Sequence, residues 1–282
     1  MIRTPPGWGA DMLTQAYRSM TSVSNVEGEQ QSGVPEVRRI DLDDLRWALA
    51  RGWEDFCASR SDVMFLCVLY PLLGLLLGRL AFGYEMMPLV FPLVSGFALI
   101  GPLAAVGLNE MSRRRELGLS AGWADAFQVF RSPSFPAIAL LGVALLMIFL
   151  FWLVIAQLIY ILTLGPQPPE SLGAFVHDVF YTSAGRAMAI IGTGVGFAFA
   201  VVTLSITAVS FPMLLDRRVG LETAILTSVN VVWRNPLTFA VWGIIVVGGL
   251  IIGSIPALLG LIIVLPVLGH ATWHLYRRVV LR

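Results

Sequence analysis

Six long apolar stretches constrain the fold of this 282-residue chain more than any other feature. Each holds about 20 mostly apolar residues, which is the length that a helix needs to cross the hydrocarbon of a bilayer. The sequence therefore predicts an all-α, polytopic membrane protein with six transmembrane helices. The expected spans are about 62–82, 88–108, 136–163, 187–215, 236–253 and 255–276.

The composition supports a membrane environment and excludes several other classes of protein. Hydrophobic residues make up 57% of the chain and charged residues only 13%, whereas a soluble domain has roughly 25% charged residues. The apolar content is too high for a disordered chain, and two cysteines are too few for a disulfide scaffold. With 19 basic and 18 acidic residues, the charge balance does not indicate a nucleic-acid partner.

The positions of the arginines predict the orientation in the membrane. All 19 basic residues are Arg, and only Arg79 and Arg186 lie outside the two termini and the loops after the second and fourth spans. By the positive-inside rule, these termini and loops are expected on the cytoplasmic side of a bacterial inner membrane. Residues 1–36 lack apolar periodicity and a signal-peptide core, so we expect a disordered cytoplasmic tail there. Residues 37–282 then form the membrane domain.

A short amphipathic segment precedes each odd-numbered span, which predicts three tandem units of an interfacial helix followed by a hairpin. The segments are 45–59, 123–130 and 221–233. Each is followed by an arginine and a small polar residue that can cap the next helix: Arg60-Ser61, Arg131-Ser132 and Arg234-Asn235. We expect the three arginines to contact lipid head groups; the alternative is that they converge on an anionic ligand. The expected interfacial face of the first segment consists of Leu45, Leu49, Trp53 and Phe56.

Two histidines near the end of the sixth span form the one pattern that could hold a metal. His270 and His274 are four residues apart and therefore share a helix face. Glu110 and Asp216 occupy similar positions at the ends of the second and fourth spans and would be the further ligands. The alternative is a polar belt of hydrogen-bonded groups at the point where the helices leave the membrane.

Three GxxxG pairs within the spans predict close packing of helices, because two small residues let helix backbones approach each other in lipid. The pairs are Gly74 with Gly78, Gly192 with Gly196, and Gly249 with Gly253. The glycine-rich run 192–196 lies inside a span with no strand before it, so it does not indicate a nucleotide-binding loop.

Three segments resemble an uncharacterised bacterial integral-membrane family, a domain of unknown function. They are residues 44–56 (DLRWALARGWEDF), 101–110 (GPLAAVGLNE) and 265–278 (LPVLGHATWHLYRR). Some members of that family carry a label as a cytochrome c oxidase subunit. A catalytic haem–copper subunit needs several histidine ligands from several spans, and here both span histidines lie on one span. The resemblance therefore implies at most an accessory or assembly role.

The leading hypothesis is a non-catalytic accessory, assembly or scaffold component associated with respiratory complexes. Its partners would be membrane lipids and other membrane-protein subunits, and it would need no cofactor. No catalytic motif occurs in the sequence, and the spans carry no ionisable residue at mid-depth such as marks many transport pathways. The rival hypothesis is a transporter or channel for a small neutral or amphiphilic solute, based on Gln157, Thr193, Thr203, Ser205 and Thr207. A third is a metal or haem site on His270 and His274.

Overall fold

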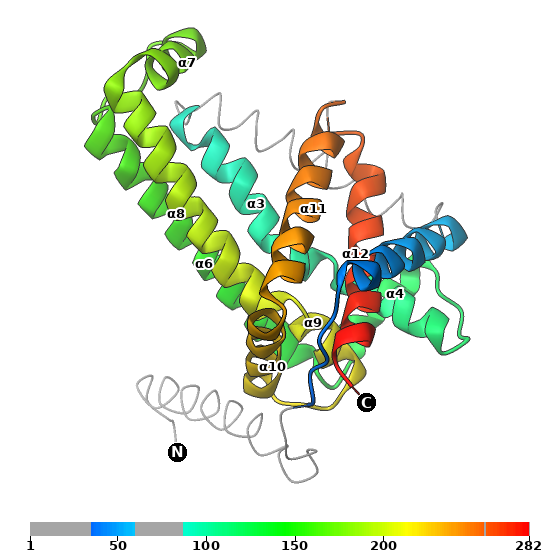
Figure 1. Ribbon diagram of the computed structural model, residues 1–282. Coiled ribbons are helices and arrows are strands. Elements are labelled where there is room, and N and C mark those ends of the chain that lie inside the picture. Colours follow the sequence, from blue (N-terminus) through cyan, green and yellow to red (C-terminus); the bar gives the residue numbers. More distant parts are fainter. Residues whose placement is uncertain (1–34, 60–86, 257, 282) are drawn as a thin grey trace, which may run out of the picture.

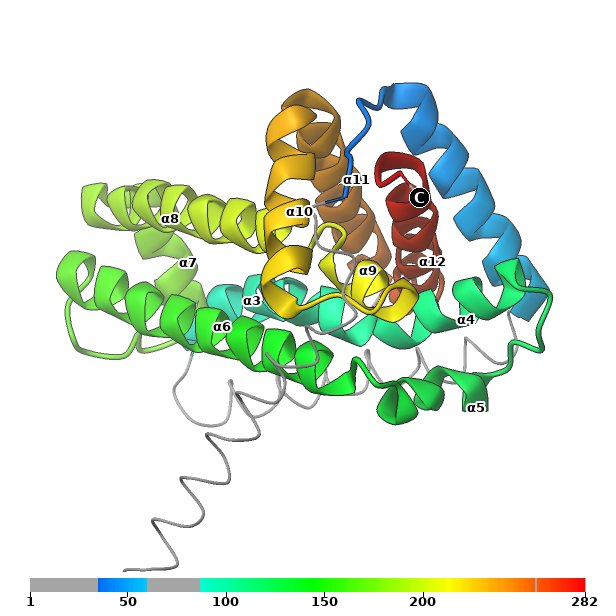
Figure 2. The same ribbon diagram turned by 90° about the horizontal axis from the view of Figure 1, so that it is seen from below.

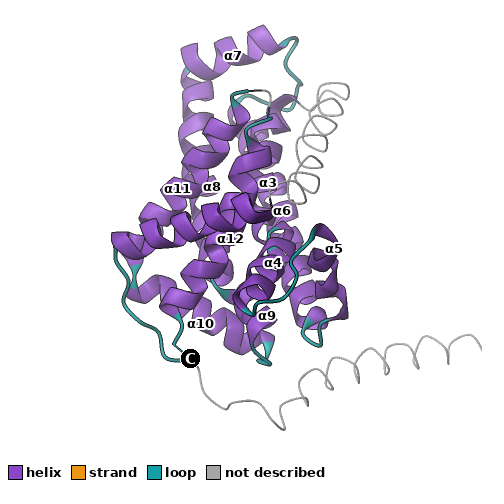
Figure 3. Cartoon of the chain, turned by 90° about the vertical axis from the view of Figure 1, so that its right-hand side faces the viewer, coloured by secondary structure: helices purple, strands orange, loops and turns teal. Residues whose placement is uncertain are grey.

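The computed structural model describes residues 35–59, 87–256 and 258–281 of the chain. Within these ranges the chain forms helices, turns and loops, with one antiparallel bridge between Val37 and Val280 (Figures 1 and 3). The all-α prediction is confirmed. The predicted first span, the pair Gly74 and Gly78, Arg60 and nearly all of the predicted N-terminal tail lie outside the described residues.

Three helical segments of the described residues are long and apolar enough to cross a membrane. They are α6 (Phe135–Thr163), the α8–α9 segment (Ser183–Asp216) and α11 (Pro236–Ser254), which correspond to the third, fourth and fifth predicted spans. Both α6 and α11 carry proline in the first turn, where an N–H group has no partner within the helix in any case. The sequence located these two helices to within one residue at each end.

The predicted fourth span is two helices rather than one. Helix α8 covers Ser183–Thr207 and α9 covers Ser210–Asp216. At the break, the backbone N–H of Val209 donates a hydrogen bond to the Ser228 hydroxyl, at 3.3 Å. Ser228 belongs to α10 (Leu221–Arg234), so a neighbouring helix satisfies the amide that the break releases.

The second and sixth predicted spans also differ from the structure. After the short 3₁₀ turn η2 (Met87–Leu89), α3 (Val90–Ala104) ends and α4 (Val106–Glu116) begins around Ala105. Pro102 lies just before this break, and proline cannot donate a helical hydrogen bond. Helix α12 (Leu261–Val279) starts six residues after the predicted position, because the chain first turns through Leu258 with a φ of +68°. The described residues therefore do not confirm the six-span hairpin arrangement.

The outward faces of the long helices are apolar, as expected for contact with lipid. On α6 and α8 the exposed side chains include Leu140, Met147, Phe151, Ile190 and Phe197. Helix α7 (Leu172–Tyr181) lies across one end of the α6–α8 hairpin (Figures 1 and 3). At the opposite end lie α9, α10 and the C-terminal turns of α12 (Figure 1). Together with the C-terminal turns of α4, we call these elements the basal end.

Two main hydrophobic cores hold the helices together. One joins the chain around residues 37–48 to α10, α11 and α12, with Phe239, Trp273 and Tyr276 almost fully buried. The other joins α4, α6 and α9, with Leu141 and Phe211 at its centre. Figure 2 shows α11, α12 and the helix over residues 42–59 (blue) next to one another on one side of the molecule.

All three predicted segments before the spans are helical: residues 42–59, α5 (Trp123–Ala126) with η3 (Phe127–Arg131), and α10. The predicted interfacial face of the first one is divided. Leu45 and Phe56 are buried against protein, at 2% and 5% exposure, together with Ala48 and Gly52, whereas Trp53 is 51% exposed and remains available to the membrane interface. The small side chains let this helix lie directly on α12, so it packs against protein and not only against lipid.

Asn235 does not cap α11 as predicted. Its side-chain oxygen accepts a hydrogen bond from the backbone N–H of Ile40 at 2.8 Å, and its NH₂ group donates to the carbonyl oxygens of Arg38 and Val231. Arg234 donates to the carbonyl oxygen of Val37 at 3.3 Å. The Arg-Asn pair therefore holds an extended segment from the other end of the chain, which residue propensity alone could not indicate.

The predicted glycine pairs differ in what surrounds them. A Cβ on Gly253 would lie 2.9 Å from the Leu261 side chain, and one on Gly249 would lie 3.1 Å from Val264, so both lie at the tight contact between α11 and α12. A Cβ on Gly196 would lie 3.1 Å from the Trp152 ring, whereas one on Gly192 would meet open space.

Candidate functional site

The two predicted histidines lie where α12 meets α4 and the 42–59 helix. A Cβ on Gly52 would lie 2.7 Å from backbone atoms of α12, and one on Gly269 would lie 2.5 Å from the Leu108 side chain of α4. Both glycines are therefore needed for these helices to approach so closely. The close approach brings polar side chains from all three helices together.

These side chains form one buried hydrogen-bond network around Asp55. The Ser112 hydroxyl donates to Asp55 Oδ2 at 2.6 Å, and His274 Nε2 lies 2.8 Å from the same oxygen. Ser112 Oγ also lies 2.8 Å from His270 Nδ1. A hydroxyl has only one proton, so His270 Nδ1 is the donor to Ser112 when Ser112 donates to Asp55.

Arg115 completes the network from its exposed side. One guanidinium nitrogen lies 2.7 Å from Asp55 Oδ1 and 2.9 Å from the carbonyl oxygen of Glu54. Burial alone would raise the pKa of Asp55, but hydrogen bonds from His274 and Ser112 and the two nearby imidazoles outweigh it, so the pKa lies below its usual value. Asp55 is therefore a buried carboxylate held in its ionised form.

The network combines residue types found in hydrolases, but its geometry is that of a packed interior. Ser112 is 1% exposed and its hydroxyl is directed to a carboxylate, so the oxygen does not face the surface. His274 Nε2 and His270 Nδ1 are both engaged in the network. Among the described residues, no group of three or more His, Cys, Asp and Glu side chains is arranged to hold a metal ion.

Glu110 and Asp216, the other two polar residues predicted near the histidines, belong to separate ion pairs at the basal end. Glu110 accepts two hydrogen bonds from Arg113, at 2.7 and 2.9 Å, which raise the pKa of the arginine. Asp216 accepts from the Tyr276 hydroxyl at 2.7 Å and from Arg277 at 3.2 Å. The structure therefore places these two carboxylates in ion-pair clusters that are separate from the histidine network.

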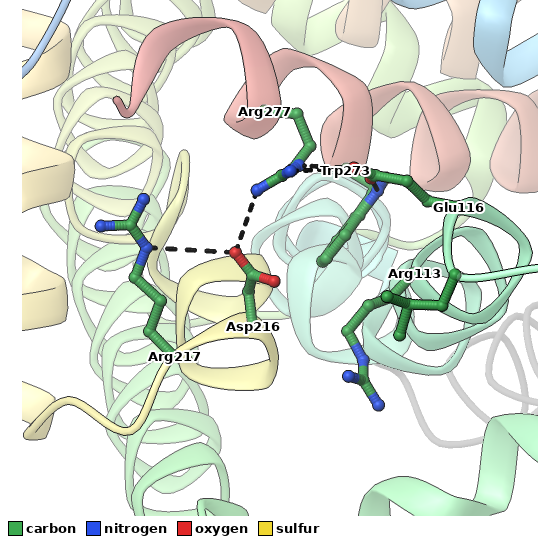
Figure 4. Close-up of a pocket in the computed structure, with 7 residues that line it drawn as sticks. Arg113, Glu116, Asp216, Arg217, Trp273 and Arg277 are labelled. Carbon is green, nitrogen blue, oxygen red and sulfur yellow. Dashed lines mark hydrogen bonds and ion pairs between the residues drawn. The ribbon is translucent and has the colours of Figure 1, made fainter. Parts of the chain in front are cut away.

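The cluster around Asp216 lines a small cavity of about 290 Å³ between α4, α9 and α12 (Figure 4). Arg277 joins two carboxylates across it, since its guanidinium also lies 2.8 Å from Glu116 Oε1. The Trp273 indole N–H donates to the other oxygen of Glu116 at 2.9 Å. Every charged group that Figure 4 joins by dashed lines thus has an opposite charge beside it.

A second cavity of about 350 Å³ lies next to the first, between the ends of α4 and α9 and the start of α6. It contains Arg131, one of the three predicted lipid- or anion-contacting arginines, whereas Arg234 is directed to Val37. The structure therefore places these two arginines at different sites. We call this cavity the basic groove.

Most of the polar residues behind the solute-transport hypothesis are satisfied locally or are not fully buried, whereas Thr203 is 4% exposed and its hydroxyl has no hydrogen-bond partner among the described residues. Ser205 and Thr207 donate to carbonyl oxygens of their own helix, those of Val201 and Thr203. Thr193 is exposed and Gln157 is half-buried. None of these side chains lines either of the two cavities described above.

Sequence reasoning missed Asp55, Ser112 and Glu116. Asp55 lies on the buried side of the 42–59 helix, three residues after Gly52, and an acidic residue on the small-residue face of an amphipathic helix was the available signal. Ser112 and Glu116 gave no signal, because their partners are distant in the sequence and only the packed helices bring them together.

Residues 90–216 match a family described as "Predicted integral membrane protein (DUF2189)". The matched region runs from α3 to α9 and includes Ser112, Glu110, Arg131 and Asp216. The match confirms the resemblance to an uncharacterised integral-membrane family. No curated protein and no solved structure matches the chain.

Proposed function

We propose that this integral membrane protein is a non-catalytic accessory or scaffold component of a larger membrane complex, with respiratory complexes as the setting that the family resemblance suggests. The observation that carries the proposal is the exposure of α8. Only 6% of the most apolar 18-residue stretch of the α8–α9 segment is buried within the chain, compared with 28% for α6 and 22% for α11.

The exposed surface of α8 has the composition of a helix-packing face. A Cβ on Gly192 or on Gly194 would meet open space, so another helix has room to approach the α8 backbone. Small residues on a membrane helix favour close helix–helix contact through van der Waals packing. We therefore assign the partner surface to the face of α8 that carries Ile190, Gly194 and Phe197, which are exposed and spaced so that they share one side of the helix.

The polar groups at the basal end support a structural rather than a catalytic role. Asp55, Glu110, Glu116 and Asp216 are each engaged by at least one cation of the same chain. Interlocked ion pairs of this kind fix the relative positions of helices and leave no charged group poised for acid–base chemistry among them.

We also propose that the chain lies in the bacterial inner membrane with both termini on the cytoplasmic side and the hairpins arranged as three related units. The N–H of Arg38 donates to the carbonyl oxygen of Val279, and the N–H of Leu281 donates to that of Glu36. This pairing supports a common side for the two ends of the described chain. The three short helices before the spans support the repeated units.

The test is purification of the intact chain from its native membrane in a mild detergent, followed by native mass spectrometry. We expect a stable stoichiometric partner, which Gly194→Ile disrupts because the larger side chain fills the contact face. Gly248→Ile is the matched control, since Gly248 of α11 is equally open and lies outside the proposed face. A chain that always elutes alone, or a partner lost equally in both variants, would contradict the proposal.

A further inference from the structure

The basic groove has an excess of positive charge from three separate parts of the chain. Arg113 and Arg114 come from the end of α4, Arg131 from the turn before α6, and Arg217 and Arg218 from the residues after α9. Only two carboxylates, those of Glu110 and Asp216, line the same cavity. The lining therefore carries three more guanidinium groups than carboxylates. One of these guanidinium groups, that of Arg114, is paired with Asp125 beside the groove at 3.2 Å.

Both carboxylates are already engaged, so they do not neutralise the remaining arginines. Glu110 binds Arg113 through both oxygens, and Asp216 accepts from Arg277 outside the groove. Within the described part of the chain, the side chains of Arg131 and Arg218 make no hydrogen bond or ion pair, and both are exposed. Two guanidinium groups thus line the groove with their donors available.

Arg217 adds a cation whose hydrogen bonds go mainly to neutral groups. It donates to the Tyr276 hydroxyl at 3.2 Å and to the carbonyl oxygen of Leu281 at 2.6 Å, while the Asp216 carboxylate lies 4.0 Å away. These contacts hold the Arg217 side chain in place at the groove without removing its charge. A fixed cation beside two available ones favours an anion with several oxygens.

The start of α6 lies at the same place and adds to the positive potential. Ser132 and Ser134 line the groove just before this 29-residue helix begins. The N-terminus of a long helix carries a partial positive charge and favours phosphate groups. One planar guanidinium group can bind two phosphate oxygens at once, through two parallel charge-assisted hydrogen bonds.

We propose that the basic groove binds a phosphate group, carried either by the head group of an anionic phospholipid or by a soluble phosphate compound. The groove lies at the start of a membrane-spanning helix, so a lipid head group can reach it from the bilayer surface. Its volume of about 350 Å³ also admits a small phosphorylated molecule. This inference is independent of the accessory role proposed above.

The test uses the full chain in nanodiscs made of phosphatidylcholine alone or with phosphatidylglycerol added. Inorganic phosphate is titrated into the first preparation while the thermal midpoint is followed, and lipid adducts are counted by native mass spectrometry in the second. The variant Arg131→Gln/Arg218→Gln removes the two arginines that have no partner in the described structure. Arg39→Gln is the control, because Arg39 is also exposed and has no described partner but lies outside the groove.

We expect the double variant to weaken binding by about tenfold or more, because it loses charge-assisted hydrogen bonds, while Arg39→Gln leaves binding unchanged. Retention of phosphatidylglycerol without a response to phosphate assigns the site to lipid, and the reverse assigns it to a soluble compound. The proposal is wrong if the unmodified chain binds neither, or if all three proteins bind alike. The ligand-free thermal midpoints report whether each variant is folded.

Discussion

His274 Nε2 lies 2.8 Å from a carboxylate oxygen of Asp55, a residue 219 positions earlier in the chain. This contact fixes the 42–59 helix on α12, and Ser112 and Arg115 tie the same carboxylate to α4. One buried carboxylate therefore joins three helices.

Replacing the carboxylate should loosen all three helices. Asp55→Asn keeps the shape of the side chain but removes the charge that His274 and Arg115 face. Since hydrogen bonds to charged groups contribute about 1.5–3 kcal/mol each, we expect a loss of at least about 2 kcal/mol in the free energy of unfolding. A fluorescence-monitored melt in detergent should show the midpoint lowered by about 4–8 °C.

The matched control for this variant is Glu54→Gln, one residue earlier on the same helix. Glu54 pairs with Arg51 at the surface, and both side chains are about half exposed. A surface pair contributes little, so the midpoint should stay within about 2 °C of the unmodified protein. Equal effects of the two variants would show that burial of Asp55 does not matter to stability.

The junction should also make stability depend on pH. The pKa of Asp55 is lower in the folded chain than its ordinary value of 3.8, so the ionised form favours folding. The stabilisation is therefore complete above that ordinary value and is lost as the pH falls through the lower, folded-state pKa. In melts from about pH 7 to pH 3, the difference in thermal midpoint between the unmodified protein and Asp55→Asn should stay constant at first. It should become smaller only below about pH 4. A difference that grows on acidification would overturn the assignment.

Two glycines with different surroundings should respond to alanine in opposite ways: Gly52 at the contact between the 42–59 helix and α12, and Gly192 in open space on α8. Gly52→Ala adds a Cβ 2.7 Å from backbone atoms of α12, and rigid backbone cannot yield as a side chain can. We expect a destabilisation of about 1–3 kcal/mol. Gly192→Ala adds a methyl group in open space, so its effect should be neutral or slightly stabilising, by up to about 1 kcal/mol. If Gly52→Ala left the free energy of unfolding unchanged, the 42–59 helix and α12 would have to lie further apart.

Asn235 should control the segment that precedes the 42–59 helix. Asn235→Ala removes its hydrogen bonds to Ile40 and Arg38 while leaving the helices around it intact. Hydrogen–deuterium exchange of peptides covering residues 36–42 should become about tenfold faster or more, because the freed amides open locally. Asn230→Ala on α10 is the control, since that side chain makes no hydrogen bond within the described residues, and unchanged exchange in Asn235→Ala would show that other contacts hold the segment.

Long apolar runs with proline at their start were sufficient to predict α6 and α11, because length and hydropathy directly reflect the bilayer. The same reasoning failed at Ala105 and at Leu258. Both positions lie inside apolar runs, and the breaks there arise from backbone hydrogen bonding and packing rather than from hydropathy. A hydropathy pattern says where apolar residues lie, but not whether one helix passes through all of them.

The candidate site was predicted only in part for a related reason. His270 and His274 were found because helical spacing puts them on one face, which is local information. Asp55 and Ser112 became partners only through contacts between residues 57 or more positions apart. Likewise, Arg131 was noted in its own loop, but the groove needs Arg217 and Arg218 from a different part of the chain.

Site-directed labelling with a membrane-impermeant maleimide tests the central claim, that lipid surrounds these helices with the basal end on the cytoplasmic side. Single cysteines would be introduced by Gly173→Cys on α7 and by Arg39→Cys near the basal end, both at exposed positions, in a background carrying Cys57→Ser and Cys67→Ser. In intact spheroplasts we predict labelling of the α7 position only, and labelling of the second position after the membrane is opened. Equal labelling of both positions in intact spheroplasts, or recovery of the chain in the soluble fraction without detergent, would contradict the account.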